Sequence, residues 1–103
     1  MIIYLIRHTK PEIPSNTCYG QSNISVVEEK FQKELIRIKA ILPTNRWDAV
    51  YSSPLKRCLC LAKALAKKPC SILTDNRLRE LNFGEWELKS WDEIDDNEVI
   101  EWG

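Results

Sequence analysis

His8 is the only histidine among the 103 residues, and it follows Arg7 directly after the apolar residues 1–6. A lone histidine usually has a structural or surface role. Here the adjacent arginine disfavours the imidazolium ion and keeps the ring neutral, which is the form that a nucleophile or a general base requires. If residues 1–6 form a strand of an open parallel sheet, His8 lies at the carboxyl edge of that sheet, where such folds bind ligands.

Arg57 falls in the first turn of a predicted helix, where a cation opposes the helix dipole. One interpretation is a solvated arginine on the surface. The other is a guanidinium that binds an anion together with the amide groups of the helix N-terminus. Residues 52–57 connect a predicted strand to this helix at the carboxyl edge of the sheet, so Arg7 and Arg57 could clamp one phosphate.

Glu80 lies among arginines and apolar side chains in the segment of residues 77–86. It is either one more solvated acid or a general acid that acts beside the phosphate. The second role requires a pKa raised by burial or by a neighbouring anion. The sequence alone leaves both interpretations open.

Charge and cysteine content narrow the classes of partner. The 15 basic and 15 acidic residues cancel, so the chain has no overall attraction to nucleic acid or to an acidic membrane. The apolar run 1–6 is too short to span a bilayer and lacks the flanks of a signal peptide, which predicts a cytoplasmic protein. The cysteines have no paired spacing, so we expect reduced thiols and no metal site; they are Cys18, Cys58, Cys60 and Cys70.

Strands and helices are predicted to alternate in one small domain. Residues 1–6 are apolar on both faces, which is typical of a central strand covered by helices. A loop follows over residues 7–22, and short strands are predicted at 47–51 and 71–74. This order predicts an α/β fold with three layers, a parallel sheet flanked by helices.

Two amphipathic helices separate the predicted strands. Ser25 starts a capping box for the first, which ends at Pro43 and has an apolar stripe of Val27, Phe31, Leu35, Ile38 and Leu42. Ser53 is the expected N-cap of the second, which residues 67–69 close and whose stripe comprises Leu55, Leu59, Ala62 and Leu65. A further helix is predicted to start at Asp92.

The chain resembles the histidine phosphatase superfamily, the phosphoglycerate mutase-like group that forms phosphohistidine. Leu5–Thr9, Ser52–Arg57 and Arg79–Glu87 resemble its three N-terminal signatures, in order and with matching spacing. The first signature usually reads Arg-His-Gly, and threonine at the third position occurs in one branch. Cys18–Ser22 is similar to the loop of alpha-ribazole phosphatase-like members, which serve cobalamin biosynthesis by assembling its lower ligand. The resemblance covers the whole chain but only part of the family's domain, so residues 1–103 are expected to form the N-terminal portion of a single histidine phosphatase domain.

The resemblance implies a phosphomonoesterase that acts on a small phosphorylated metabolite. His8 would be the nucleophile that takes the phosphoryl group, with Arg7 and Arg57 binding the phosphoryl oxygens. Glu80 would protonate the leaving alcohol. The resemblance implies no metal and no other cofactor.

The resemblance also assigns a substrate mouth and contains two departures. The residues expected along the mouth are Gly20, Gln21 and Ser22. Leu88 stands where the family usually has glycine. Family members carry a second active-site histidine on a later strand, and this chain has none.

Two other functions stay open. One is a chain that binds phosphate without turnover, and the other is a phosphoglycerate mutase-type phosphotransferase. We expect the 103 residues alone to show weak or no activity, and to self-associate or require a missing C-terminal segment. The tryptophans Trp86, Trp91 and Trp102 add to this expectation, because the sequence shows no packing partner for them.

Overall fold

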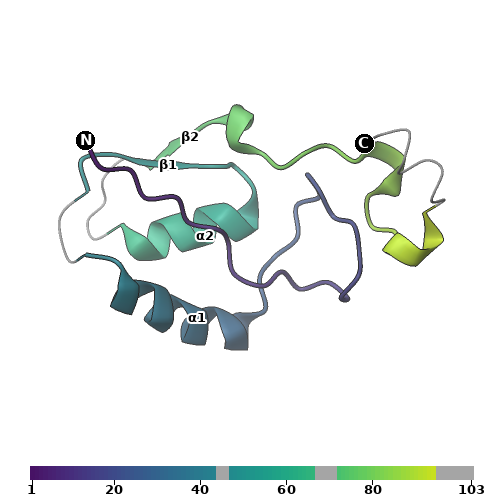
Figure 1. The fold of residues 1–103 in the computed structure, drawn as a ribbon, viewed down its shortest axis with the longest axis horizontal. Coiled ribbons are helices and arrows are strands. Elements are labelled where there is room, and N and C mark those ends of the chain that lie inside the picture. The colour runs from purple at the N-terminus through teal and green to yellow at the C-terminus, as the bar shows by residue number, and fades with distance from the viewer. Residues whose placement is uncertain (44–46, 67–71, 95–103) are drawn as a thin grey trace. The chain divides into compact units, whose positions relative to one another are not determined.

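A computed structural model describes residues 1–43, 47–66 and 72–94 (Figure 1). The chain forms two compact units. Unit 1 comprises residues 1–12 and 23–79, and unit 2 comprises residues 13–22 and 80–103. Within the described ranges, no helix combines the length and apolar character needed to cross a membrane.

Unit 1 has mixed α/β structure. Its elements are the helix α1 (Glu28–Ile41), the strand β1 (Val50–Ser52), the helix α2 (Lys56–Leu65) and the strand β2 (Ile72–Thr74), followed by a 3-10 turn over residues 76–78. The strands pair in parallel, with Val50 opposite Ile72 and Ser52 opposite Thr74. The predicted parallel sheet is therefore confirmed for its second and third strands, with α2 as the connection between them.

The core of unit 1 forms where α1 meets α2. Phe31 and Leu35 of α1 pack with Leu61 of α2, and all three are buried. Figure 1 shows α2 drawn between α1 and the strands, in agreement with its contacts to both α1 and β1.

The predicted stripe of α1 is confirmed at Phe31, Leu35 and Ile38, whereas Val27 and Leu42 are the capping residues just outside the helix. The predicted stripe of α2 is confirmed at Leu55, which is buried, and at Leu65, which packs against this core. It missed Leu61, which is the buried α2 residue of the core, whereas Leu59 is only half-buried.

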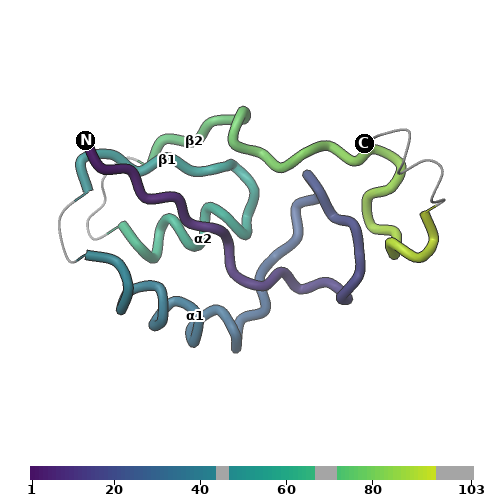
Figure 2. Tube along the Cα trace, viewed as in Figure 1, coloured from purple at the N-terminus to yellow at the C-terminus, as the bar shows by residue number. Residues whose placement is uncertain are grey.

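Residues 1–6 are not a strand, contrary to the prediction. They follow an irregular path (purple in Figure 2), and their exposed fractions range from 41% to 111%. A segment forms a strand only when a neighbouring strand completes its backbone hydrogen bonds. The described sheet consists of β1 and β2 alone, and residues 1–6 are paired with neither of them. Tyr4 is in edge-to-face contact with Trp47, with the ring centroids 5.4 Å apart.

Both helices of unit 1 begin later than predicted. Val27, not Ser25, is the N-cap of α1. Ser25 is held instead by residues 10–12, because its carbonyl accepts from the Glu12 N–H at 2.7 Å. The N-cap of α2 is Leu55, and Ser53 precedes it in a turn in which the Ser53 hydroxyl accepts from the Leu55 N–H at 3.2 Å. The predicted closing residues 67–69 lie outside the described part of the chain.

Unit 2 is built from two segments joined by backbone hydrogen bonds. The Cys18 N–H donates to the Lys89 carbonyl at 2.9 Å, and the Leu88 N–H donates to the Cys18 carbonyl at 2.6 Å. Two 3-10 turns, residues 84–86 and 91–93, occupy the second segment. The helix predicted from Asp92 is thus a short turn as far as residue 94, and the remainder of that prediction falls on residues outside the described ranges.

Trp91 has a packing partner inside unit 2, contrary to the sequence-based expectation. Its ring meets Phe83 edge to face, with the centroids 5.8 Å apart. Ile94 is buried in the same unit, and Trp86 is half-buried. Trp102 lies outside the described residues.

Leu88 adopts a left-handed backbone conformation, with φ of 69°. This is the position at which the resemblance expects glycine, and a Cβ atom makes such a conformation unfavourable. The Leu88 side chain is 61% exposed, so little packing is lost if it is removed. We expect Leu88→Gly to raise the free energy of unfolding by about 1 kcal/mol, measured by urea denaturation.

Leu81→Gly is the matched control, because Leu81 is similarly exposed and its φ is not positive. It should lower the free energy of unfolding through the extra entropy of the unfolded chain. Equal destabilisation by the two glycine variants would contradict the strain assigned to Leu88.

Candidate active site

The predicted site residues fall in both units. Arg7, His8 and Arg57 belong to unit 1, whereas Glu80 and the loop of residues 20–22 belong to unit 2. The structure therefore describes the contacts of Arg7, His8 and Arg57 within unit 1, and those of Glu80 and residues 20–22 within unit 2.

His8 is half-buried, and its ring is oriented by the next residue. The Nδ1 atom lies 2.8 Å from the carbonyl oxygen of Thr9, which is itself buried. A carbonyl oxygen can only accept a hydrogen bond, so Nδ1 carries the proton. In the neutral ring, Nε2 then holds the lone pair that a nucleophile needs.

Arg57 is one of the most buried side chains of the described chain, with 1% exposure. It is the second residue of α2, so the prediction that it lies in the first turn is confirmed. The interpretation as a solvated surface arginine is wrong. A buried guanidinium loses its hydration, which is unfavourable unless anionic or hydrogen-bonding groups replace the water. A buried guanidinium such as that of Arg57 is typical of a site that binds an anion.

The N-terminus of α2 is shaped by polar residues around Arg57. Ser52 and Ser53 are both buried, and the Ser52 hydroxyl donates to the Ser53 carbonyl at 2.8 Å. The Lys56 N–H, at the first position of α2, donates to the Asn23 side-chain oxygen at 2.7 Å. The turn before α2 is therefore fixed by hydrogen bonds between its own residues and by one with the distant Asn23.

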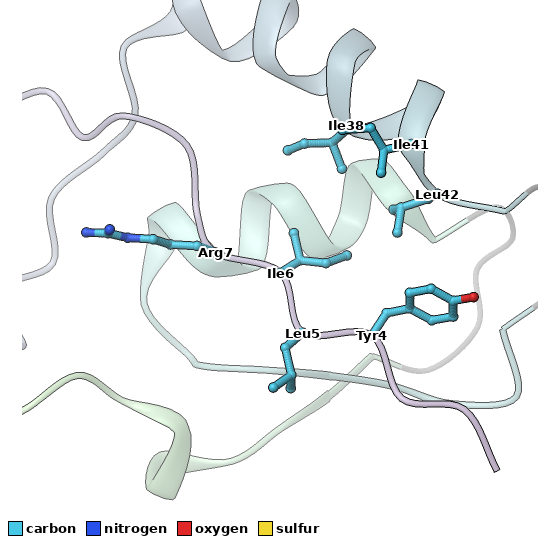
Figure 3. Close-up of a pocket in the computed structure, with 7 residues that line it drawn as sticks. All are labelled: Tyr4, Leu5, Ile6, Arg7, Ile38, Ile41 and Leu42. Carbon is cyan, nitrogen blue, oxygen red and sulfur yellow. The ribbon is translucent and has the colours of Figure 1, made fainter.

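Arg7 is exposed and borders an apolar groove of about 350 Å³ (Figure 3). The groove lies between the N-terminal segment and the end of α1, and its lining residues are Tyr4, Leu5, Ile6, Arg7, Ile38, Ile41 and Leu42. In Figure 3 the Arg7 guanidinium points away from the apolar side chains. The lining of this groove is mostly apolar, which does not suit a phosphate, and the Arg7 guanidinium points away from it.

Glu80 is linked to the loop of residues 20–22. Its carbonyl oxygen accepts a hydrogen bond from the Gln21 side-chain amide at 2.9 Å. Its carboxylate oxygen Oε1 accepts from the Leu81 N–H at 2.8 Å. The Glu80 side chain is exposed, so the burial expected for a general acid is not found within unit 2.

Glu87 contacts the predicted loop but was not among the residues that the sequence analysis selected, although it ends the third signature. Its Oε2 atom accepts from the backbone N–H groups of Gln21 and Phe83, both at 3.1 Å. Its Oε1 atom accepts from the Ser22 hydroxyl at 2.6 Å. Burial acts to raise the pKa of Glu87, but the hydrogen bonds from Ser22, Gln21 and Phe83 outweigh it and leave that pKa below its ordinary value.

The lowered pKa of Glu87 predicts a specific acid sensitivity. Ionised Glu87 stabilises the folded state above its ordinary pKa of 4.5, and this contribution is lost as the pH falls through the lower folded-state pKa. We expect Glu87→Gln to lower the free energy of unfolding near neutral pH and to flatten its decline below about pH 4.5. Urea denaturation across this range measures both effects. An acid dependence in Glu87→Gln as steep as in Glu85→Gln would contradict this explanation.

Gly20 permits the loop to approach the second segment of unit 2. Its φ is 44°, and an added Cβ would lie 2.7 Å from the Leu81 carbonyl oxygen and from Glu87 Oε2. We expect Gly20→Ala to lower the free energy of unfolding by about 2 kcal/mol or more, because both backbone strain and a steric clash oppose it.

Gly84→Ala serves as the comparison for Gly20→Ala in the same denaturation experiment. Gly84 also has positive φ, at 59°, but an added Cβ there meets nothing within 4 Å. It should show the cost of backbone strain alone. If the two variants lose the same free energy of unfolding, the steric clash expected at Gly20 does not contribute.

Comparison with known proteins supports one family. The family model of the histidine phosphatase superfamily (branch 1) matches residues 3–103. No match was found among curated proteins. The protein TTHB049 from Thermus thermophilus is similar in structure, with a TM-score of 0.73 and 22% identity over 94% of this chain and 54% of its own.

Two further solved structures are similar. A mycobacterial glucosyl-3-phosphoglycerate phosphatase has a TM-score of 0.78 and 21% identity over 92% of this chain and 47% of its own. A phosphoserine phosphatase from Entamoeba histolytica, in complex with 3-phosphoglyceric acid, has a TM-score of 0.69 and 26% identity over 89% of this chain and 47% of its own.

The chain spans about half the length of these structures. The structural matches confirm the α/β fold of the phosphoglycerate mutase-like group. The family match extends over nearly all of the chain and includes the three segments that carry Arg7, Arg57 and Glu80. The protein belongs to branch 1 of the histidine phosphatase superfamily.

Proposed function

We propose that the protein hydrolyses a phosphomonoester through a phosphohistidine at His8. The observation that carries this proposal is the hydrogen bond from His8 Nδ1 to the Thr9 carbonyl, because it places the lone pair on Nε2. Membership of a phosphatase superfamily agrees with it. No metal or other cofactor takes part in the proposed reaction.

The first step transfers the phosphoryl group. Nε2 of His8 attacks phosphorus, the bond from phosphorus to the ester oxygen breaks, and Glu80 gives its proton to that oxygen as the alcohol leaves. Arg7 and Arg57 bind the other phosphoryl oxygens. Catalysis then comes from positioning and from cations matched to the charge that these oxygens carry.

The second step returns the enzyme to its starting state. Water attacks the phosphorus of phosphohistidine and passes its proton to the Glu80 carboxylate. The nitrogen–phosphorus bond breaks, its electron pair returns to Nε2, and inorganic phosphate is released. Each turnover thus consumes one water and leaves His8 neutral and Glu80 protonated.

For the substrate, we propose alpha-ribazole-5'-phosphate. Two features support this choice, threonine at position 9 and the loop Cys18–Ser22, in which Gly20, Gln21 and Ser22 would line the substrate mouth. Similar solved structures are named as phosphatases of phosphoserine and of glucosyl-3-phosphoglycerate, which favours a small phosphorylated metabolite in any case.

A substrate panel tests this proposal. The natural protein that carries this sequence is given alpha-ribazole-5'-phosphate, phosphoserine and 3-phosphoglycerate, and released phosphate is measured. The proposal predicts the highest kcat/KM for alpha-ribazole-5'-phosphate. A higher kcat/KM for phosphoserine would overturn the substrate, and transfer of phosphate to another glycerate without release would favour a mutase.

A second candidate is a chain that binds phosphate without turnover. The observation that favours it is the single histidine, since the resemblance leads us to expect two in the active site. Calorimetric titration of the 103-residue chain with phosphate, together with the activity assay, separates the two. Binding that needs Arg57, with no release of phosphate from any phosphomonoester, would favour the non-catalytic function. We propose that the 103 residues alone have weak activity or none.

A further inference from the structure

The Glu87 carboxylate forms hydrogen bonds with both segments of unit 2, residues 13–22 and residues 80–103. Two of its hydrogen-bond donors, Gln21 and Ser22, lie in the first segment. The third donor, the Phe83 N–H, lies in the second. Both carboxylate oxygens accept hydrogen bonds, Oε2 from Gln21 and Phe83 and Oε1 from Ser22. The carboxylate therefore connects the two segments through both of its oxygens.

This tie reaches Glu80 through Gln21. The backbone N–H of Gln21 donates to Glu87, while its side-chain amide donates to the Glu80 carbonyl at 2.9 Å. Gly20 lies so close to Glu87 Oε2 and to the Leu81 carbonyl that a Cβ atom would come within 2.7 Å of each. The loop therefore lies against the backbone that directly follows the Glu80 side chain, at the carbonyl groups of Glu80 and Leu81.

Only a carboxylate suits this position. An ionised carboxylate accepts hydrogen bonds at both oxygens and donates none, and its three partners at Glu87 are all donors. A glutamine keeps one accepting oxygen for the two backbone N–H groups, while its amide group must donate to the Ser22 oxygen instead. Glu85, two residues earlier in the 3-10 turn whose C-cap is Glu87, is exposed.

We propose that Glu87 is a positioning residue, whose carboxylate holds the loop of residues 20–22 against the backbone of Glu80 and so sets the place of the acid. The proposal rests on the proposed function in that Glu80 is taken as the acid. Glu87 itself does not touch the reacting atoms. Its removal should displace Glu80 without changing the chemistry available to His8.

Amide hydrogen exchange tests the tie without reference to activity. In Glu87→Ala we expect exchange at the Gln21 and Phe83 amides to accelerate about tenfold or more, and the Leu81 amide, which donates to the Glu80 carboxylate, to follow. Glu87→Gln should give an intermediate effect, and it keeps the test decisive if the alanine variant does not fold. Glu85→Ala is the control and should match the original chain. Unchanged exchange at Gln21 and Phe83, or a change that does not reach Leu81, would overturn the proposal.

Leaving-group dependence separates positioning from general damage. The natural protein is assayed with p-nitrophenyl phosphate, whose leaving group needs little protonation, and with phosphoserine, whose leaving alkoxide does. We expect Glu87→Ala to lower kcat for phosphoserine about tenfold more than kcat for p-nitrophenyl phosphate, with partial recovery in Glu87→Gln. An equal loss for both substrates would overturn the positioning role. If the unmutated protein hydrolyses neither substrate, the proposed function is contradicted. The hydrogen-exchange experiment would still show whether Glu87 holds the loop of residues 20–22 against the second segment.

Discussion

His8→Ala should lower kcat by at least about 10³-fold with p-nitrophenyl phosphate, because the variant has no nucleophile to form the covalent intermediate. The chain contains no other histidine that could substitute for it. Glu12→Ala is a suitable control, since Glu12 is exposed and its backbone N–H, not its side chain, holds Ser25. The measurement is steady-state release of p-nitrophenol by the natural protein that carries this sequence.

Added imidazole makes the His8 test more specific. If the only defect of His8→Ala is the missing ring, free imidazole should restore part of the activity, whereas it cannot restore a misfolded chain. Activity of His8→Ala close to that of Glu12→Ala would contradict the role of His8 as nucleophile.

Arg57→Ala should lower kcat/KM by about 30-fold or more, equivalent to a loss of at least about 2 kcal/mol of transition-state stabilisation. The expected effect is large because Arg57 is 1% exposed, and a charge–phosphate interaction in such surroundings is little weakened by water. Lys63→Ala, an exposed position in the last turn of α2, removes the same charge from the same helix and should have little effect.

Burial also means that Arg57→Ala creates a cavity, so a second variant is needed. Arg57→Lys keeps the charge but loses the planar pair of donors, and we expect it to recover only part of kcat/KM. Circular dichroism verifies the fold of each variant. If Arg57→Ala folds and has the kcat/KM of Lys63→Ala, Arg57 does not bind the phosphoryl oxygens.

The sequence was sufficient to predict the features that depend on local pattern. The strand–turn–helix from Val50 to Leu65 follows from an apolar run, a Ser-Pro pair and helical spacing, and it placed Arg57 in the first turn of α2. The buried face of α1 follows in the same way from the spacing of Phe31 and Leu35. These features need no knowledge of distant contacts.

The features that the sequence did not predict depend on distant partners. Residues 1–6 have the composition of a strand, but a strand also needs a hydrogen-bonded neighbour, and in the described sheet these residues are paired with neither β1 nor β2. Ser25 has the spacing of an N-cap, but Glu12 engages its carbonyl, which composition does not show. Glu87 was missed because its partners Gln21 and Ser22 are 66 and 65 residues away in the chain.

The burial of Arg57 was likewise not decided by the sequence, which left a solvated arginine open as the alternative. Its position in the first turn of α2 was predictable, but its exposure depends on how α2 packs within unit 1. The structure resolves this alternative and at the same time leaves Glu80 exposed within unit 2. The role of Glu80 as the general acid is a prediction of the proposed function.

The central claim, a phosphoryl group carried by His8, is tested most directly by trapping the intermediate. The natural protein is mixed with a radiolabelled phosphomonoester, quenched in alkali within the first turnover, digested, and its labelled peptide sequenced. We expect an acid-labile, alkali-stable label on the peptide that contains His8, and no label in His8→Ala. Turnover with the label on a serine or a carboxylate, or with no covalent label at all, would contradict the claim.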